Sequence, residues 1–313
     1  MNTRPLGNTA LEIAPLVLGG NVFGWTADAR VSAQVLDRFV DGGLNAIDTA
    51  EMYSAWVPGH QGGESESVIG DWLAGRPGLR ERLVLITKVG ADLGAGRSGL
   101  SARRIVEACE GSLKRLRVET IDLYFSHFPD SETPIEETLR AHESLIASGK
   151  VRAIGASNYS AEQLREALAV SGAAGLPRYA VVQPEYNLVT RDRFEGPLRD
   201  LCVAEGLGVI TYYALAAGFL SGKYRSPADF SKSARGGSMQ KYLDNPRAMQ
   251  LLTALDTVAA RRDATPAEVA LAWLMGRDGV TAPIASATSV EQVDSLIRST
   301  QLELTAEDLA ELE

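Results

Sequence analysis

Residues 121–154 read IDLYFSHFPDSETPIEETLRAHESLIASGKVRAI, in which two short apolar runs flank a longer amphipathic stretch. Inside that stretch, Thr133-Pro134-Ile135-Glu136 has the form of a capping box with proline at the first helical position, and Gly149 is expected to stop the helix. The two runs are apolar on both faces, as in strands of a parallel sheet that helices cover. The pattern therefore predicts a strand, a helix and a second strand parallel to the first.

The same alternation of short apolar runs and helical stretches continues along the whole chain. The runs span residues 16–18, 44–47, 83–86, 121–125, 151–154, 180–182, 208–210 and 280–284. Ser101, Ser160 and Thr265 each open a helical stretch, the last two as capping boxes. Eight strands that alternate with helices predict repeated β-α-β units in a parallel sheet.

Two architectures fit this pattern: an eight-stranded barrel and an open, doubly wound sheet. An open nucleotide-binding sheet usually carries Gly-x-Gly-x-x-Gly after its first strand. Here that strand ends in Gly19-Gly20-Asn21-Val22-Phe23-Gly24, which does not match, and no helix follows at once. The length also suits a barrel. We therefore expect one domain over residues 1–313: a (β/α)8 TIM barrel with an N-terminal β-hairpin that turns at Gly7-Asn8 and extra C-terminal helices.

Composition and charge exclude several classes of protein. The 313 residues include 40 acidic and 31 basic ones, so the formal charge of −9 argues against nucleic acid or an anionic membrane as partner. No run approaches the roughly 20 apolar residues of a membrane span, and the N-terminus lacks the apolar stretch of a signal peptide. Cys109 and Cys202 lie in apolar helical patterns without metal-ligand spacing, so both are expected to be inert core thiols. These features predict a soluble, cytoplasmic protein without a metal.

Polar residues stand at the ends of six consecutive predicted strands. They are Asp48, Lys88, His127, Ser157, Asn158, Gln183 and Tyr212. Each could have a local role, such as capping a helix or forming a turn. In a barrel, however, the carboxyl ends of all strands meet at one rim, which is where barrel enzymes keep their chemistry. A single site at that rim explains all of these residues together.

An acid, a lysine, an imidazole and a phenol can together move a proton on and off a carbonyl oxygen. Tyr53 lies five residues after Asp48 and can reach the same rim. A phenol is a poor proton donor or acceptor at neutral pH, and a neighbouring ammonium such as that of Lys88 would lower its pKa. The imidazole of His127 could donate to the carbonyl oxygen. The chain shows no Ser-His-Asp order and no nucleophilic cysteine pattern.

The motifs resemble the aldo-keto reductase superfamily, in its bacterial branch related to potassium-channel β subunits. GLNAIDTAEMY (43–53) is similar to the family signature around a catalytic Asp and Tyr, ITK (86–88) to the lysine motif and DLYFSH (122–127) to the histidine motif. GASN (155–158), QPEYN (183–187) and YYALAAGFLSGK (212–223) are similar to segments that hold a nicotinamide cofactor. The match runs in order along nearly the whole chain.

The resemblance implies hydride transfer from a nicotinamide dinucleotide to a carbonyl compound. Asp48, Tyr53, Lys88 and His127 would be catalytic, with Tyr53 as proton donor. NADPH is the expected cofactor, with NAD possible. Its implied contacts are Gly20, Asn21, Asp48, Ser157, Asn158, Gln183, Tyr212, Ala214, Leu215, Ala216, Gly218, Leu220, Lys223, Ile284, Ser286, Thr288 and Gln292.

The adenosine end departs from the family pattern. Ser289 to Gln292 has the form of a capping box, so a helix N-terminus would face the adenosine phosphate. Thr288 stands where the family often has a basic residue for the 2′-phosphate, and the usual Glu-Asn pair that reads adenine is replaced at residues 295–296. Lys223 or Arg235 could supply the missing positive charge, so NADPH is still the expected preference.

The substrate is expected to be a small carbonyl compound held by loop residues. The candidate contacts are Phe23, Trp25, Tyr53, Trp56 and His127. The Gly- and Ser-rich segment 224–246 could be a lid over the site or a disordered surface loop. We expect a monomer or a small homo-oligomer. The alternative function is a cofactor-binding regulatory subunit of the channel β-subunit type.

Overall fold

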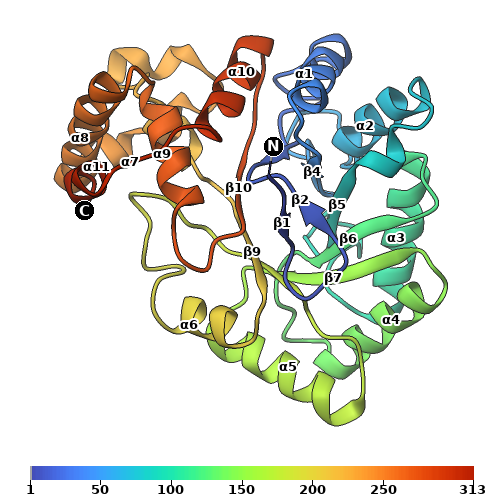
Figure 1. Cartoon of the computed structure of the whole chain (residues 1–313). Coiled ribbons are helices and arrows are strands. Elements are labelled where there is room, and N and C mark those ends of the chain that lie inside the picture. Colours follow the sequence, from blue (N-terminus) through green and yellow to red (C-terminus); the bar gives the residue numbers. More distant parts are fainter. Residues whose placement is uncertain (1) are drawn as a thin grey trace.

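The computed structural model describes residues 2–313 and closes eight parallel strands into a barrel (Figure 1). Around the barrel the strands follow the order β10-β3-β4-β5-β6-β7-β8-β9, so strands that are consecutive in the chain pair with each other. The strands are β3 (Val17–Gly19), β4 (Ala46–Asp48), β5 (Val84–Val89), β6 (Ile121–Ser126), β7 (Val151–Ser157), β8 (Val181–Gln183), β9 (Gly208–Thr211) and β10 (Ala282–Ala285). The predicted TIM barrel is confirmed, and the open sheet is excluded.

Helices surround the barrel and continue into a C-terminal group (Figure 1). The α-helices are α1 (Ala29–Asp41), α2 (Glu64–Ala74), α3 (Ala102–Leu116), α4 (Ile135–Ala147), α5 (Ala161–Ala174), α6 (Pro197–Ala204), α7 (Gln240–Leu243), α8 (Pro246–Arg262), α9 (Pro266–Met275), α10 (Val290–Ser299) and α11 (Ala306–Glu311). Short 3-10 turns are η1 (Arg80–Arg82), η2 (Ala216–Ser221), η3 (Pro227–Lys232) and η4 (Gly236–Ser238). None of the helices within residues 2–313 is long and apolar enough to cross a membrane.

The predicted N-terminal hairpin closes one end of the barrel. Strands β1 (Arg4–Pro5) and β2 (Glu12–Ile13) pair antiparallel, and Leu6 and Ile13 are buried in the same apolar cluster as the barrel interior. Gly7 has a φ of +60°, and a Cβ there would lie 2.3 Å from the carbonyl oxygen of Ala180. The turn therefore packs against the start of β8 and β9, and it leaves the opposite end of the barrel, where the strands finish, for a site.

The helix starts confirm two of the predicted capping boxes. Ser160 forms a capping box with Gln163, and Thr265 forms one with Glu268. The box predicted at Thr133 is wrong, because α4 begins at Ile135 without a side-chain cap. The Thr133 hydroxyl instead donates to Asp130 in the preceding loop, at 2.7 Å. The hydroxyl is therefore turned toward a residue three positions earlier in the chain and does not accept from the first turn of α4.

Both cysteines are buried core thiols, as predicted. Cys109 lies on α3 and Cys202 on α6, and neither is in a disulfide. Burial raises the pKa of each thiol to about 12. Since the thiolate is the reactive form of cysteine, neither side chain is an available nucleophile at neutral pH.

A buried histidine on α4 predicts that stability depends on pH. His142 packs against Tyr124 and Tyr179, and burial lowers its pKa to about 4. Between about pH 6.5 and 4 the His142 side chain of the unfolded chain gains a proton that the folded protein does not gain. The free energy of unfolding should therefore fall by roughly 3 kcal/mol as the pH falls through that window.

Urea unfolding at pH 7 and at pH 4.5 measures this contribution. The His142→Gln variant should lose roughly 2 to 3 kcal/mol less stability between the two pH values than the unmodified protein does, because the other titrating groups are common to both. The same pH dependence in both proteins would contradict the assignment to His142.

Candidate active site

The ends of the barrel strands open into a cavity of about 670 Å³. The residues predicted for the site that line it are Asn21, Trp25, Asp48, Tyr53, Trp56, His127, Ser157, Asn158, Gln183, Tyr212, Ala214, Leu215, Gly218, Lys223, Ile284, Ser286, Thr288 and Gln292. Parallel pairing all around the barrel brings these side chains together, because it places every strand's carboxyl end at the same rim.

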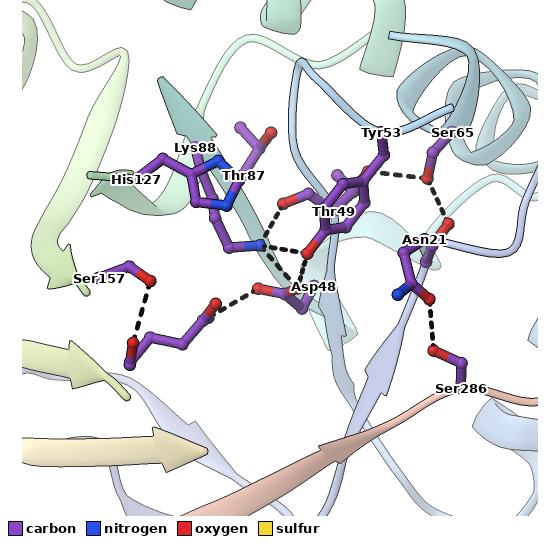
Figure 2. Close-up of polar contacts among 12 residues, drawn as sticks. Asn21, Asp48, Thr49, Tyr53, Ser65, Thr87, Lys88, His127, Ser157 and Ser286 are labelled. Atoms are coloured by element: carbon purple, nitrogen blue, oxygen red, sulfur yellow. Dashed lines mark hydrogen bonds and ion pairs between the residues drawn. The ribbon is translucent and has the colours of Figure 1, made fainter. Parts of the chain in front are cut away.

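Asp48, Lys88 and Tyr53 form one hydrogen-bonded cluster (Figure 2). The Lys88 ammonium donates to Asp48 Oδ2 at 2.7 Å and to the Tyr53 hydroxyl at 3.0 Å. The Tyr53 hydroxyl donates to the same Asp48 oxygen at 3.1 Å. Asp48 ends β4 and Lys88 lies on the neighbouring strand β5, so strand pairing sets their separation. The phenol of Tyr53 reaches them from the loop after β4.

A backbone oxygen completes the surroundings of Lys88. Its ammonium also donates to the carbonyl oxygen of Thr49 at 2.7 Å, and the whole side chain is buried (Figure 2). Burial lowers the pKa of Lys88, and the Asp48 carboxylate acts in the opposite direction. The three acceptors around the ammonium, two of them oxygens of the Asp48-Thr49 segment, hold it in a single position.

The pKa of Tyr53 is shifted in the direction opposite to the one expected from the sequence. Burial raises that pKa well above its ordinary value, and the charge and hydrogen bond of Asp48 raise it further. The ammonium of Lys88 was expected to lower it, but in this structure the burial and the carboxylate outweigh the nearby cations. Tyr53 therefore holds its proton at neutral pH, which suits a proton donor.

His127 lies beside Tyr53, just after β6. The two ring centroids are 6.3 Å apart, at a steep angle. Burial lowers the pKa of His127 well below its ordinary value, and the Lys88 ammonium lowers it further. The imidazole is therefore neutral at pH 7 and carries one N–H that can donate. Its buried Nδ1 has no hydrogen-bond partner among residues 2–313.

Four polar side chains on adjacent strands form a second network. Asn158 donates to the carbonyl oxygen of His127 at 2.9 Å and accepts from the Tyr212 hydroxyl at 2.7 Å. Gln183 donates to Asp48 Oδ1 at 3.0 Å, and the Ser157 hydroxyl donates to the Gln183 carbonyl oxygen at 2.9 Å. Asn158 has a φ of +63°, a backbone conformation that costs energy in a non-glycine residue. The hydrogen bonds on both sides of its amide hold it there.

Five residues predicted for the site are not among those that line the cavity: Lys88, which lies behind Asp48 and Tyr53, and Gly20, Phe23, Ala216 and Leu220. The Phe23 ring is fully buried in the core and is not among the residues that line the cavity. Ala216 and Leu220 belong to the 212–223 segment but are buried in the apolar core. The Gly20 backbone donates to Asp48 and accepts from the Ser65 hydroxyl, which locates it behind the site.

The adenosine-side residues lie at the end of β10 and the start of α10. Ser289 caps α10 by accepting from the Gln292 backbone, but the other half of the predicted box is absent. Gln292 Oε1 instead accepts from the Thr288 backbone N–H at 2.8 Å. The Ser286 hydroxyl donates to Asn21 at 2.7 Å and so joins β10 to the loop after β3 (Figure 2).

The segment after Lys223 has secondary structure of its own. It forms η3, η4 and α7, and its residues 232–235 line the cavity. The Tyr224 and Ser233 hydroxyls are hydrogen bonded to each other across the segment. It covers part of the site, as one of the two readings of the sequence proposed.

Several residues that line the cavity were not predicted from the sequence. Met52, Phe128 and Tyr213 line the cavity, and the Phe128 ring stacks on His127 with centroids 4.7 Å apart. Each is next to a predicted site residue in the chain, and that adjacency was the available signal. No sequence pattern indicated that the Thr49 carbonyl oxygen would accept from Lys88, because every residue carries a backbone carbonyl.

Comparison with known proteins gives one family. Residues 15–313 match the model of the aldo/keto reductase family. The chain is 34% identical over 314 residues to a Bacillus subtilis (strain 168) protein named uncharacterized oxidoreductase YrpG, a match that covers 97% of this chain and 92% of that one. It is 32% identical over 301 residues to a probable voltage-gated potassium channel subunit beta of Oryza sativa subsp. japonica, which covers 94% and 89% of the two chains. This chain belongs to the aldo/keto reductase family.

Proposed function

We propose that the protein is an NADPH-dependent oxidoreductase that reduces an aldehyde or a ketone to the alcohol. The observation that carries the proposal is the contact of Lys88 with both Asp48 and Tyr53, in a cavity that also contains His127. The nicotinamide cofactor supplies a hydride to the carbonyl carbon when it is bound.

The residues present suit such a cofactor. Gln183 Oε1 accepts no hydrogen bond within residues 2–313, so an acceptor is free beside Ser157 and Asn158 for a carboxamide. Small residues, Ala217 and Gly218 among them, line the cavity between Tyr212 and Lys223 and leave space for a dinucleotide. Lys223 makes no ion pair within residues 2–313, and its ammonium lies near Gly218, where it could bind a phosphate.

The protein's own groups then act on the carbonyl oxygen. The neutral imidazole of His127 donates a hydrogen bond that orients the oxygen. As negative charge develops there, Tyr53 transfers its hydroxyl proton to that oxygen. The ammonium of Lys88, 3.0 Å from the Tyr53 oxygen, stabilises the phenolate that is left, and Asp48 keeps the ammonium in place.

Assaying the purified protein for carbonyl reduction tests the proposed function directly. The purified protein should reduce members of a panel of aldehydes, quinones and keto-sugars with NADPH, and its tryptophan fluorescence should respond to the cofactor. A fluorescence response without turnover of any compound would favour the alternative, a cofactor-binding regulatory subunit. No response to NADPH or NADH would contradict both.

We predict a preference for NADPH over NADH that depends on Lys223. Replacing Lys223 by alanine should reduce kcat/KM for NADPH about tenfold and that for NADH less, as expected for loss of one charged contact to a phosphate. Lys232→Ala is the matched control, because Lys232 also lines the cavity but is paired with Asp229 at 2.7 Å. A higher kcat/KM with NADH in the unmodified protein would contradict the preference.

A further inference from the structure

A buried ion pair lies behind the site, outside the cavity wall. Glu51 accepts from the Arg104 guanidinium at 2.5 Å, and the two residues are only 4% and 7% exposed. Neither is among the residues that line the cavity. Glu51 lies in the loop after β4, two residues before Tyr53, and Arg104 lies on α3. The pair therefore joins the loop that carries the proposed acid to the outer layer of helices.

Glu51 also joins this loop to the end of β5. Its other carboxylate oxygen accepts from the Gly90 backbone N–H at 3.3 Å, and its own backbone N–H donates to the carbonyl oxygen of Lys88 at 3.4 Å. Gly90 follows Lys88 by two residues in the chain. Glu51 thus connects the segment that carries Tyr53 with the segment that carries Lys88, the two groups whose 3.0 Å contact the proposed chemistry needs.

A second buried side chain fixes the loop directly after Tyr53. The Ser54 hydroxyl donates to the carbonyl oxygen of Phe23 at 2.9 Å, and Ser54 has a φ of +72°. The Tyr53 backbone N–H itself donates to the carbonyl oxygen of Ala50 at 3.1 Å, a local turn that does not fix the loop against the barrel. Glu51 and Ser54 therefore anchor the loop on the two sides of the phenol, and Glu51 does so through a charge.

The energetics favour a positioning role for the pair over a stabilising one. A buried ion pair contributes little net stability, because removing two charges from water costs about as much as their attraction returns. The pairing is also incomplete, since Arg104 Nε is buried and has no hydrogen-bond partner within residues 2–313. Burial raises the pKa of Glu51, and Arg104 opposes that shift. Such a pair adds little to stability, but it fixes the direction of a side chain, which apolar packing does not.

We propose that the Glu51–Arg104 pair holds the Tyr53 hydroxyl against the Lys88 ammonium, so that both members are positioning residues for the reaction. This inference rests on the proposed function and adds two residues that act through Tyr53. Without the pair the local turn remains, but the phenol is no longer held at one distance from the ammonium. A misplacement of about 1 Å can cost roughly 10²-fold in rate. Loss of the pair should therefore lower kcat and leave cofactor binding intact.

Replacing Arg104 by methionine tests the proposal. At saturating NADPH, kcat for an aldehyde that the unmodified protein reduces should fall roughly 10- to 100-fold, and the Kd for NADPH should change less than about twofold. Arg104→Lys keeps a cation and should restore part of kcat. In the Tyr53→Phe background the same Arg104→Met change should lower kcat less than about twofold, because the pair acts through the hydroxyl that is already missing.

Two further variants separate positioning from loss of stability. Arg104→Met leaves the buried Glu51 carboxylate without its counterion, whereas Glu51→Gln/Arg104→Met removes both charges. The double variant should recover thermal stability but not kcat. The control is Arg262→Met, which breaks a contact of another buried carboxylate, Asp308, and neither of these residues lines the cavity. It should lower Tm and leave kcat unchanged.

The outcomes distinguish the two proposals. No turnover of any aldehyde by the unmodified protein would overturn the proposed function, and this inference with it. A normal kcat in Arg104→Met or in the double variant would overturn only the inference. So would an equal loss of kcat with and without the Tyr53 hydroxyl, since the pair would then act on the fold as a whole.

Discussion

The Tyr53→Phe variant is expected to reduce carbonyls at least about 10²-fold more slowly than the unmodified protein, the lower range for loss of a general acid. The substitution keeps the ring, so packing against Trp56 and His127 should survive. It removes the hydroxyl that accepts from Lys88 and donates to Asp48. Cofactor binding should be retained, and kcat at saturating NADPH is the quantity to measure.

A second tyrosine provides the matched control. Tyr213 lines the same cavity but is 47% exposed, and its hydroxyl makes no hydrogen bond within residues 2–313, so Tyr213→Phe should change kcat little. The competing assignment makes His127 the acid. Under it, Tyr53→Phe would keep most of kcat and His127→Gln would abolish it. Near-normal kcat in Tyr53→Phe would end the assignment of Tyr53.

The second large effect is expected for Lys88→Met. Turnover should fall by about 10²-fold or more, because the phenolate left by Tyr53 loses its neighbouring cation. Loss of the ammonium should also raise the pKa of Tyr53. In the direction of alcohol oxidation, which needs Tyr53 to accept a proton, the pH–rate profile should therefore shift to higher pH. Initial rates between pH 6 and 10 measure this shift.

Lys88→Met could also act by destabilisation, since it leaves the buried Asp48 carboxylate without a counterion. The double variant Asp48→Asn/Lys88→Met removes both charges. It should recover thermal stability and NADPH binding but not turnover. Lys114→Met, a change at an exposed position on α3, is the control for loss of a lysine. Recovery of turnover in the double variant would show that Lys88 has only a structural role.

Local patterns in the sequence predicted the barrel and most of the site. A strand in a helix-covered parallel sheet is apolar on both faces, so each strand could be recognised from its own residues. Once eight such strands were placed in one barrel, the polar residues that followed Ile47, Thr87 and Ser126 had to share a rim. This is why Asp48, Lys88 and His127 could be grouped although they lie far apart in the chain.

Loop residues were less predictable. Phe23 and Trp25 lie two residues apart in the same loop, and both were expected at the substrate. The first ring is buried in the core and the second lines the cavity. Loops have no fixed periodicity, so which side chain faces inward depends on what packs against it. Thr133 failed as a cap because its hydroxyl donates to Asp130 in the same loop and does not face the backbone of α4.

The amino-acid sequence alone was sufficient for the fold class, the order of the strands and the polar residues that end them at one rim, since these follow from local hydrophobic periods and motif spacing. Charge and protonation depended on tertiary contacts. Burial and Asp48 raise the pKa of Tyr53, against the expectation from Lys88 alone. Arg235, which the sequence offered with Lys223 as a source of positive charge for the cofactor, lies over Trp25 in the cavity wall. Electrostatic energies are set by distance and by exclusion of water, and both are properties of segments that meet only in the folded chain.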